Sequence, residues 1–247
     1  MNIDMGMHYS KTKSSLLAGA AAALLWSAAD MLLVGFVPQA GKHLLFSQVL
    51  AGQINAELAL LMLDAPAWRL FWGVYLATFS VFLYLLAVYG IYRLLRPGRV
   101  SQLTALLLLL GYALSPLGHA GFAYIGLLAQ GMQHASGAAL EAQIVAFLQF
   151  EHLLQVHWAA SVGASALGWA LLLAQVLARR TALPRKAAWL NPLLLAPCIG
   201  LACLPFSDRL VAVLIGCASL NIAQLAFFLG VQWFLRQSNA GARSGGH

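Results

Sequence analysis

Charged side chains are scarce in this chain: Asp, Glu, Lys and Arg together make up only 9% of its 247 residues. Soluble domains contain ~25% charged residues, so this composition excludes an ordinary soluble protein. Apolar residues instead account for 62% of the chain. Such a sequence is typical of a protein embedded in a membrane.

Cysteine is also rare, and the familiar catalytic and cofactor motifs are missing. Cys198, Cys203 and Cys217 lie in apolar segments without a CxxC or His/Cys spacing, and we interpret them as buried structural thiols. No P-loop, GxSxG or dinucleotide-binding motif occurs, and no two histidines have zincin spacing. We therefore predict no cofactor and no metal, although histidines from different helices together with Asp30 or Glu57 would suit a metal ion.

The apolar residues form long runs. The run over 105–110 (ALLLLL) does not alternate with polar residues, which argues against a membrane β-barrel. Runs of ~18 or more apolar residues favour membrane-spanning helices. We predict an all-α polytopic membrane helical bundle, made of one domain over 1–236 and followed by a disordered cytoplasmic tail over 237–247. Its six transmembrane helices are expected at about 14–36, 68–94, 102–129, 151–178, 187–206 and 209–235.

The basic residues indicate an orientation. Eleven of the fourteen Lys and Arg residues fall on one side of the predicted membrane, and only Lys42, Arg69 and Arg209 fall on the other. The positive-inside rule then places both termini in the cytoplasm of a multi-pass cell-membrane protein. It also explains the net charge of +7 without a nucleic-acid partner. We expect 14–36 to be an uncleaved first span, because it is longer than a signal-peptide h-region.

The acidic residues have the opposite distribution. Six of the seven carboxylates fall at the outer side or in the outer half of a span. Carboxylates contribute little to topology, so their position needs a separate explanation. These six residues are Asp30, Glu57, Asp64, Glu141, Glu151 and Asp208.

Two stretches between the spans are predicted to form amphipathic helices at the outer surface. The segment 48–65 is too polar to span, and Glu57 and Asp64 fall on one helical face. The segment 130–150 has a similar pattern and leads into Glu151. The two helices would form a lid over the bundle or would simply be loops packed against it.

Asp30 is the most informative single residue. It lies in the sequence WSAADMLLVGF, about two-thirds through the first predicted span. A charged group at this depth costs several kcal/mol unless it is paired or reaches water. Asp30 is therefore a functional candidate, the alternative being a structural partner for a neighbouring Arg, His or Trp.

Histidines in the neighbouring spans favour an acid–base site. Burial raises the pKa of a carboxylic acid and lowers that of a histidine, so both can approach neutrality in a wet apolar pocket. The candidate catalytic residues are Asp30 and Glu57 as acids, with His119 and His157 as bases. They lie on different helices, so their geometry cannot be read from the sequence.

The candidate substrate-binding residues are mostly aromatic or polar groups near these acids and bases. Arg69 would pair with Asp64, Asp30 or Glu57, or would bind an anionic head group. Tryptophans fit the interfacial belt or a pocket wall, and Asn221 fits an interhelical hydrogen bond. The full set is Trp26, Arg69, Trp72, Tyr124, Glu151 and Asn221.

Two runs, AALLWSAADMLLVGF and AELALLMLDAPAWRLFWG, carry a family resemblance that covers mainly residues 18–95. They resemble an uncharacterised group of bacterial multi-pass membrane proteins of similar length, a family of unknown function. This resemblance implies about six spans and no settled activity. A looser analogy is to small membrane enzymes that isomerise or cyclise sterols and isoprenoids with intramembrane acids, histidines and tryptophans.

Three functions remain open. The first is an acid–base enzyme or binder with a pocket in the outer half of the bilayer, acting on a lipid or isoprenoid. The second is a proton-coupled small-molecule transporter with Asp30 as the coupling carboxylate. The third is a non-catalytic assembly subunit. Membrane lipids and a hydrophobic small molecule are the expected partners, and the sequence does not indicate an oligomeric state.

Overall fold

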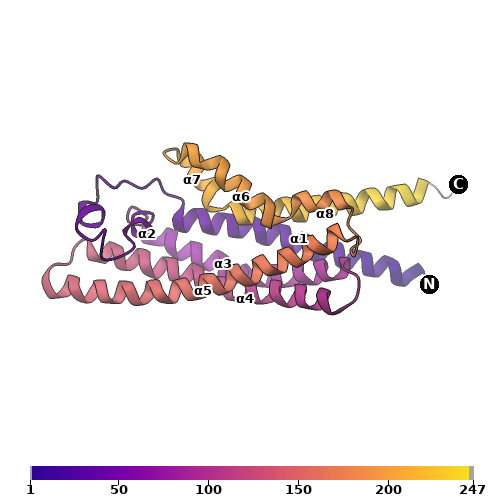
Figure 1. Cartoon of the computed structure of the whole chain (residues 1–247), viewed down its shortest axis with the longest axis horizontal. Coiled ribbons are helices and arrows are strands. Elements are labelled where there is room, and N and C mark those ends of the chain that lie inside the picture. The colour runs from indigo at the N-terminus through magenta and orange to yellow at the C-terminus, as the bar shows by residue number, and fades with distance from the viewer. Residues whose placement is uncertain (1, 245–247) are drawn as a thin grey trace.

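The computed structural model describes the backbone of residues 2–244 and the side chains of residues 10–237. Over this part of the chain it is an all-α helical bundle without a strand. Figure 1 shows an elongated molecule whose long helices run side by side, with both ends of the chain at the same end of the bundle. The predicted all-α fold class is confirmed.

Four long helices form most of the bundle: α1 (Asn2–Val34), α3 (Ala67–Leu94), α4 (Arg99–Met132) and α5 (Gly137–Leu177). Each contains a stretch long and apolar enough to cross a membrane. At 1.5 Å per residue, α4 and α5 exceed ~30 Å of hydrocarbon by a wide margin, so their ends extend beyond it. The protein is therefore a helical membrane protein.

The C-terminal third differs from the two simple spans predicted at 187–206 and 209–235. It contains a 3₁₀ turn (Arg185–Leu190), α6 (Pro192–Cys203), a second 3₁₀ turn (Leu204–Phe206), α7 (Leu210–Cys217) and α8 (Ser219–Ser244).

Helix α6 is only about 18 Å long at 1.5 Å per residue. Proline explains this length, since Pro192 begins α6 and Pro205 lies in the 3₁₀ turn after it. Helices α7 and α8 meet at an angle of 66°. The described residues thus contain four helices that could span, or five if the bent pair counts as one span. The predicted count of six is not reached by this criterion.

The segments at the end opposite the termini are also arranged differently from the prediction. Instead of one amphipathic helix over 48–65, a π-helical turn (Leu45–Val49) is followed by the five-residue α2 (Ala56–Leu60). Asn55 accounts for this break, because its side chain accepts a hydrogen bond from the Leu58 N–H at 3.1 Å and caps α2. The predicted helix within 130–150 is the first part of α5, which continues without interruption to Leu177.

Residues 43–66, called the cap here, pack against the ends of α4 and α5. Phe46 and Met62 are fully buried, together with Ala129 of α4 and Phe147 of α5. These side chains belong to a hydrophobic core separate from the one inside the bundle. The cap is therefore a packed structure rather than a helix lying on the membrane surface.

Small residues allow α4 and α5 to approach closely. A Cβ on Gly111 would lie 2.1 Å from the Ser165 Oγ, and one on Gly168 would lie 2.8 Å from the Leu108 side chain. Small residues at such positions are the usual means by which membrane helices pack closely. The α4–α5 seam is thus closed along this part of its length.

Helices α5 and α8 are separated instead. Over the described residues, no Cα of α5 lies within 8 Å of a Cα of α8. Large side chains bridge the gap at one level, where the Trp169 and Phe227 rings meet with centroids 4.8 Å apart. Beyond that bridge the two helices leave space for a cavity.

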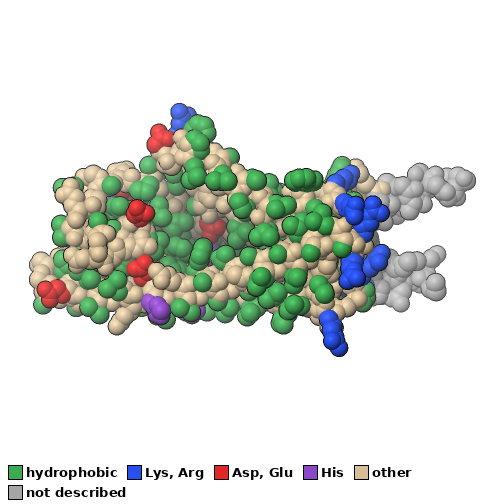
Figure 2. All heavy atoms as spheres, viewed as in Figure 1, with side chains coloured by type: hydrophobic (Ala, Val, Ile, Leu, Met, Phe, Trp, Pro, Cys, Tyr) green, Lys and Arg blue, Asp and Glu red, His purple; other side chains and the backbone are tan. Residues whose placement is uncertain are grey.

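Charge is distributed unevenly along the bundle. Figure 2 shows most of the visible Lys and Arg side chains near the end that carries both termini, whereas the visible Asp and Glu side chains lie toward the middle and the opposite end. The predicted disordered tail over 237–247 begins within α8, whose backbone is helical to Ser244, and residues 245–247 lie outside the described part.

Candidate functional site

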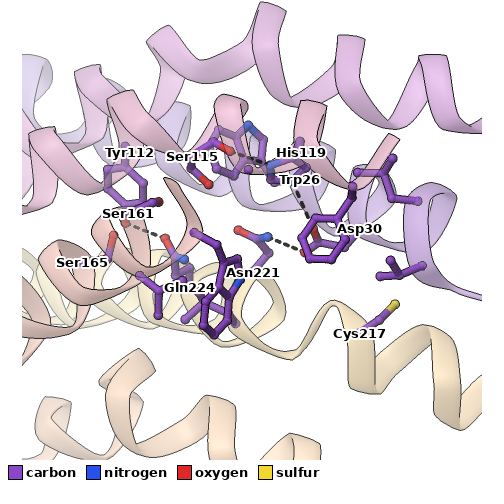
Figure 3. Close-up of a pocket in the computed structure, with 17 residues that line it drawn as sticks. Trp26, Asp30, Tyr112, Ser115, His119, Ser161, Ser165, Cys217, Asn221 and Gln224 are labelled. Atoms are coloured by element: carbon purple, nitrogen blue, oxygen red, sulfur yellow. Dashed lines mark hydrogen bonds and ion pairs between the residues drawn. The ribbon is translucent and has the colours of Figure 1, made fainter. Parts of the chain in front are cut away.

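A cavity of about 260 Å³ lies between α1, α4, α5 and the α7–α8 bend. Figure 2 shows this face of the molecule hollowed between α5 and the α6–α7 segment. Figure 3 shows polar side chains from several helices converging on the cavity. Its polar lining consists of Asp30, Tyr112, Ser115, His119, Ser161, Ser165, Asn221 and Gln224.

Asp30 is held at the cavity wall by two neighbours. It lies one turn before the end of α1, and its Oδ1 is 3.1 Å from the Nε2 of His119 on α4. Its Oδ2 accepts a hydrogen bond of 2.7 Å from the Asn221 amide nitrogen of α8. The Asp30 and His119 side chains are 19% and 10% exposed. Three helices therefore combine to hold one carboxylate inside the bundle.

The backbone fixes the protonation pattern of this pair. The Nδ1 of His119 is 3.0 Å from the Ser115 carbonyl oxygen, which can only accept, so Nδ1 carries a proton. The contact between Nε2 and the Asp30 Oδ1 then contains a second proton, bound to either atom. The pair is an imidazolium with a carboxylate or a neutral imidazole with a carboxylic acid. In both forms its net charge is zero.

A buried tyrosine orients Asn221. The hydroxyl of Tyr84 donates to the Asn221 Oδ1 at 2.7 Å, which turns the amide nitrogen toward Asp30. A parallel bond of 2.5 Å joins the Tyr112 hydroxyl to the Gln224 Oε1. The two tyrosine rings stack with centroids 4.2 Å apart. Polar groups of α8 are thus held by tyrosines of α3 and α4.

Trp26 packs the other side of the pair. Its ring lies edge-on to His119, with centroids 5.1 Å apart, and to Tyr84, at 4.9 Å. Its indole N–H donates to the Ser80 hydroxyl at 3.0 Å, and this hydroxyl in turn donates to the Leu76 carbonyl. The indole therefore has a fixed orientation and limits the movement of the imidazole.

Gly118 keeps the cavity open. It is buried, yet a Cβ added at this position would meet no atom within 4 Å. The space in front of it is part of the cavity, which Gly118 and His119 both line. A larger residue here would fill the cavity without displacing the side chains that form the pair.

The comparisons with known proteins identify the family. A family model described as "Family of unknown function (DUF6796)" matches residues 1–238. The chain belongs to this family. No curated protein and no solved structure matches it. DUF6796 membership agrees with the expected resemblance to an uncharacterised family, and the function has to be argued from the cavity.

Four residues predicted from the sequence meet at the cavity of this DUF6796 protein: Asp30, His119, Trp26 and Asn221. Two of the predicted catalytic residues lie elsewhere. Glu57 is exposed at the start of α2 in the cap, and the half-buried His157 does not line the cavity. The structure therefore assembles one of the two predicted acids with one of the two predicted bases.

The other predicted binding residues lie outside the cavity. Arg69 donates to the Met31 carbonyl at 2.8 Å and covers the Phe36 ring at 3.9 Å. Among the ion pairs of residues 10–237 none includes Arg69, so its predicted pairing with Asp64, Asp30 or Glu57 is wrong. The cavity is not lined by Trp72, Tyr124 or Glu151. The first two are exposed, and Glu151 is partly exposed.

A second Asp–His pair lies in the cap region. The carboxylate of Asp64 bonds to Lys42, and its Oδ2 is 3.0 Å from the His43 Nε2. Partial burial raises the pKa of Asp64, but the hydrogen bonds from Lys42 and His43 outweigh this effect, so the pKa lies below its usual value.

Tyr84, Tyr112 and the serines of α5 belong to the site but were not predicted from the sequence. A tyrosine in an apolar span gives no signal that separates a hydrogen-bonding role from packing. Ser161 and Ser165 are four residues apart on one helical face, which is a signal that could have been used. Among the side chains of residues 10–237, no three His, Cys, Asp or Glu groups are placed to hold a metal ion.

Proposed function

We propose that this protein is an acid–base enzyme of the isomerase or cyclase type that acts on a lipid or isoprenoid within the membrane. The Asp30–His119 pair, at the wall of a cavity inside a helical membrane bundle, is the observation that carries this proposal. A carboxylate in this setting costs several kcal/mol unless it is paired. A purely structural role would not require a cavity in front of it.

The pair can donate and accept the protons that an isomerisation moves. Such a reaction adds a proton at one position of the substrate and removes one from another, so the enzyme ends with the number it began with. Asp30 in its carboxylic acid form would donate, and neutral His119 or the resulting carboxylate would accept. Because the pair contains a single mobile proton, it regains its starting state when it takes up a proton from the substrate.

We further propose six crossing segments, with both termini in the cytoplasm of the cell membrane. After α5 the chain leaves the end that carries the termini through α6, and it returns through α7 and α8 (Figure 1). An even count results whether the α6–α7 hairpin crosses fully or only enters the membrane. Basic residues near that end support a cytoplasmic location. The cavity would then lie in the outer half of the bilayer.

Lipid analysis of cells tests the enzymatic proposal. Extracts are compared from cells that lack the protein and from cells that express the wild-type chain, Asp30→Asn or His119→Gln. We expect a protein-dependent lipid change that falls by ~10²-fold or more in both variants, the usual effect of losing a general acid or base. Glu57→Gln and His157→Gln serve as controls and should leave the change intact. An undiminished change in Asp30→Asn would show that Asp30 is not the acid.

A proton-coupled transporter is the second candidate, and the bend between α7 and α8 favours it. The 66° break falls directly at the cavity, because Cys217 before the break and Asn221 after it both line the cavity. Broken helices at a membrane binding site are typical of transporters. Proton uptake by proteoliposomes that depends on a solute gradient and is lost in Asp30→Asn, without any lipid change in cells, would favour this candidate over the enzyme.

A further inference from the structure

A second hollow lies beside the polar cavity, between α5 and α6. It has a volume of about 260 Å³, and its lining is almost entirely apolar. Helix α6 contributes Ala196, Pro197 and Gly200, while α5 contributes Ala166 and Trp169. We call this hollow the α5–α6 groove.

The groove and the polar cavity adjoin one another. Val162, Ser165 and Leu220 line both. The separation of α5 from α8 explains this continuity, since α6 covers only part of the gap that α8 leaves. One space therefore has a polar lobe at the Asp30–His119 pair and an apolar lobe facing the bilayer. An amphiphilic molecule has the same division.

The lining of the polar lobe indicates the chemistry of the head group. None of the described residues that line it is Lys or Arg, and the Asp30–His119 pair has no net charge. A phosphate placed here would be buried without a Lys or Arg in the lining to pair with it, which is strongly unfavourable, because the Arg69 guanidinium near Cys217 is bound to the Met31 carbonyl.

The partners left for a ligand are the Ser115 and Ser165 hydroxyls and the Gln224 amide nitrogen, because both ends of the Asn221 amide are already bound. These groups suit a hydroxyl or carbonyl group.

We propose that the α5–α6 groove holds the single hydrocarbon chain of an uncharged amphiphile, whose hydroxyl or carbonyl head lies beside Asp30 and His119. This inference rests on the proposed function and specifies its substrate class. It excludes prenyl diphosphates and phospholipids as substrates, because the head groups of both carry a charged phosphate.

The membrane setting explains how the two lobes divide their roles. A hydrocarbon chain is already in an apolar medium in the bilayer, so moving it into the groove contributes little hydrophobic free energy. Selectivity therefore comes from the head group, and the groove provides a lateral entrance. The substrate reaches the pair without passing its head through the aqueous phase.

Photocrosslinking tests the groove directly. The full-length protein in nanodiscs is labelled with hexadecanol that carries a diazirine near the end of its chain, with and without excess unlabelled hexadecanol. We expect competable labelling of residues 192–200. Gly200→Leu fills the groove, because a Cβ there has only the Ser219 Oγ near it, at 3.9 Å. This variant should lose labelling by about tenfold or more, the usual effect of obstructing an apolar pocket.

Gly163→Leu is the matched control. Gly163 lies on α5, the helix that faces α6 across the groove, but it is exposed, has open space in front of its Cα and lines neither lobe. The same change of residue there should leave labelling unchanged. If Gly200→Leu does not fold, Ala166→Leu narrows the groove from the α5 side and replaces it. Equal labelling of the groove variant and Gly163→Leu would overturn the proposal.

Competition with hexadecyl phosphate tests the head group. Unlabelled hexadecanol should compete far better than the phosphate of the same chain length, and equal competition would refute the uncharged head. The result is separate from catalysis. Labelling that depends on Gly200, in a protein that changes no cellular lipid, would support the groove and overturn the enzyme. A lipid change that Gly200→Leu and Ala166→Leu leave intact would support the enzyme and overturn the groove as the place where the substrate binds.

Discussion

The molecule contains two aspartate–histidine pairs of nearly the same geometry in very different surroundings. In the pair inside the bundle, called the inner pair here, the Asp30 Oδ1 and the His119 Nε2 are 3.1 Å apart; in the pair at the cap, called the outer pair, the Asp64 Oδ2 and the His43 Nε2 are 3.0 Å apart. Lys42 also binds the Asp64 carboxylate, whereas the other partner of Asp30 is the neutral amide of Asn221.

The difference shows that the residue pair alone does not decide its role. A permanent cation keeps Asp64 ionised, so this pair ties residues 42 and 43 to the end of the cap. Asp30 lacks such a cation and lies against a cavity, so its proton has two possible positions and a ligand can reach it. Under the proposed function, the third partner and the free space distinguish the structural pair at the cap from the catalytic pair in the bundle.

The largest effect should come from filling the cavity while both pairs stay intact. Gly118→Leu occupies open space beside His119. We expect the protein-dependent lipid change to fall by ~10²-fold or more, since a displaced substrate loses general acid–base catalysis altogether. Lipid analysis of cells measures this effect, and circular dichroism checks the fold.

Gly52→Leu makes the same substitution in the cap, where a Cβ would also meet nothing within 4 Å. It should have no effect on the lipid change. Full activity of Gly118→Leu would show that the lipid change does not need the cavity, and the free space would then no longer distinguish the two pairs.

Removing the amide from the inner pair should have the next largest effect. Asn221→Ala leaves the Tyr84 hydroxyl and the Asp30 Oδ2 without their partners. Each buried group left unpaired costs ~1–3 kcal/mol. The thermal midpoint of the purified protein should fall clearly, and less so in the Tyr84→Phe variant, which loses only one donor. A midpoint unchanged in Asn221→Ala would mean that water replaces the amide and that the network does not hold Asp30.

Acid should weaken the outer pair in a defined direction. The pKa of Asp64 is lower in the folded protein than its usual value of 3.8. Its stabilising contribution is therefore present above the unfolded value and is lost as the pH falls through the folded value. Hydrogen exchange of residues 43–66, corrected for the intrinsic pH dependence of exchange, should accelerate below about pH 4. Asp64→Asn should abolish this pH dependence, and its persistence would assign the transition to another group.

The smallest effect should follow from Lys42→Ala. The Lys42 side chain is 57% exposed, and exposed ion pairs contribute only ~0.2–1 kcal/mol. The cap should exchange slightly faster, and the lipid change should stay at the wild-type level. A large loss of the lipid change would connect the cap to the cavity and contradict the division of roles between the two pairs.

Part of the site could be read from the sequence because some signals belong to single helices. Asp30, His119 and Asn221 are polar residues in otherwise apolar runs, and the cost of burying them marks each one without knowledge of its neighbours. Glu57 and His157 carry the same signal but do not reach the cavity. Which face of a largely apolar helix points inward depends on how the helices pack, and the sequence pattern contains little of this information.

The same limit applies to the fold. Four spans could be predicted because length and hydropathy alone define them. The ends of α6 and the bend before α8 could not, since a proline kinks a helix or ends it according to what its neighbours provide for the freed carbonyl groups. Tyr84 and Tyr112 escaped prediction because their hydroxyl partners come from α8, far away in the sequence.

Deuterium transfer from solvent shows whether the Asp30–His119 pair moves protons to and from a lipid. Membranes that contain the wild-type protein, Asp30→Asn or Asp64→Asn are incubated in D₂O, and their lipids are analysed by mass spectrometry for deuterium bound to carbon. If the inner pair performs acid–base chemistry, a lipid gains deuterium with the wild-type protein and with Asp64→Asn, and it gains none with Asp30→Asn. Equal incorporation with Asp30→Asn, or loss of incorporation with Asp64→Asn, would contradict the account.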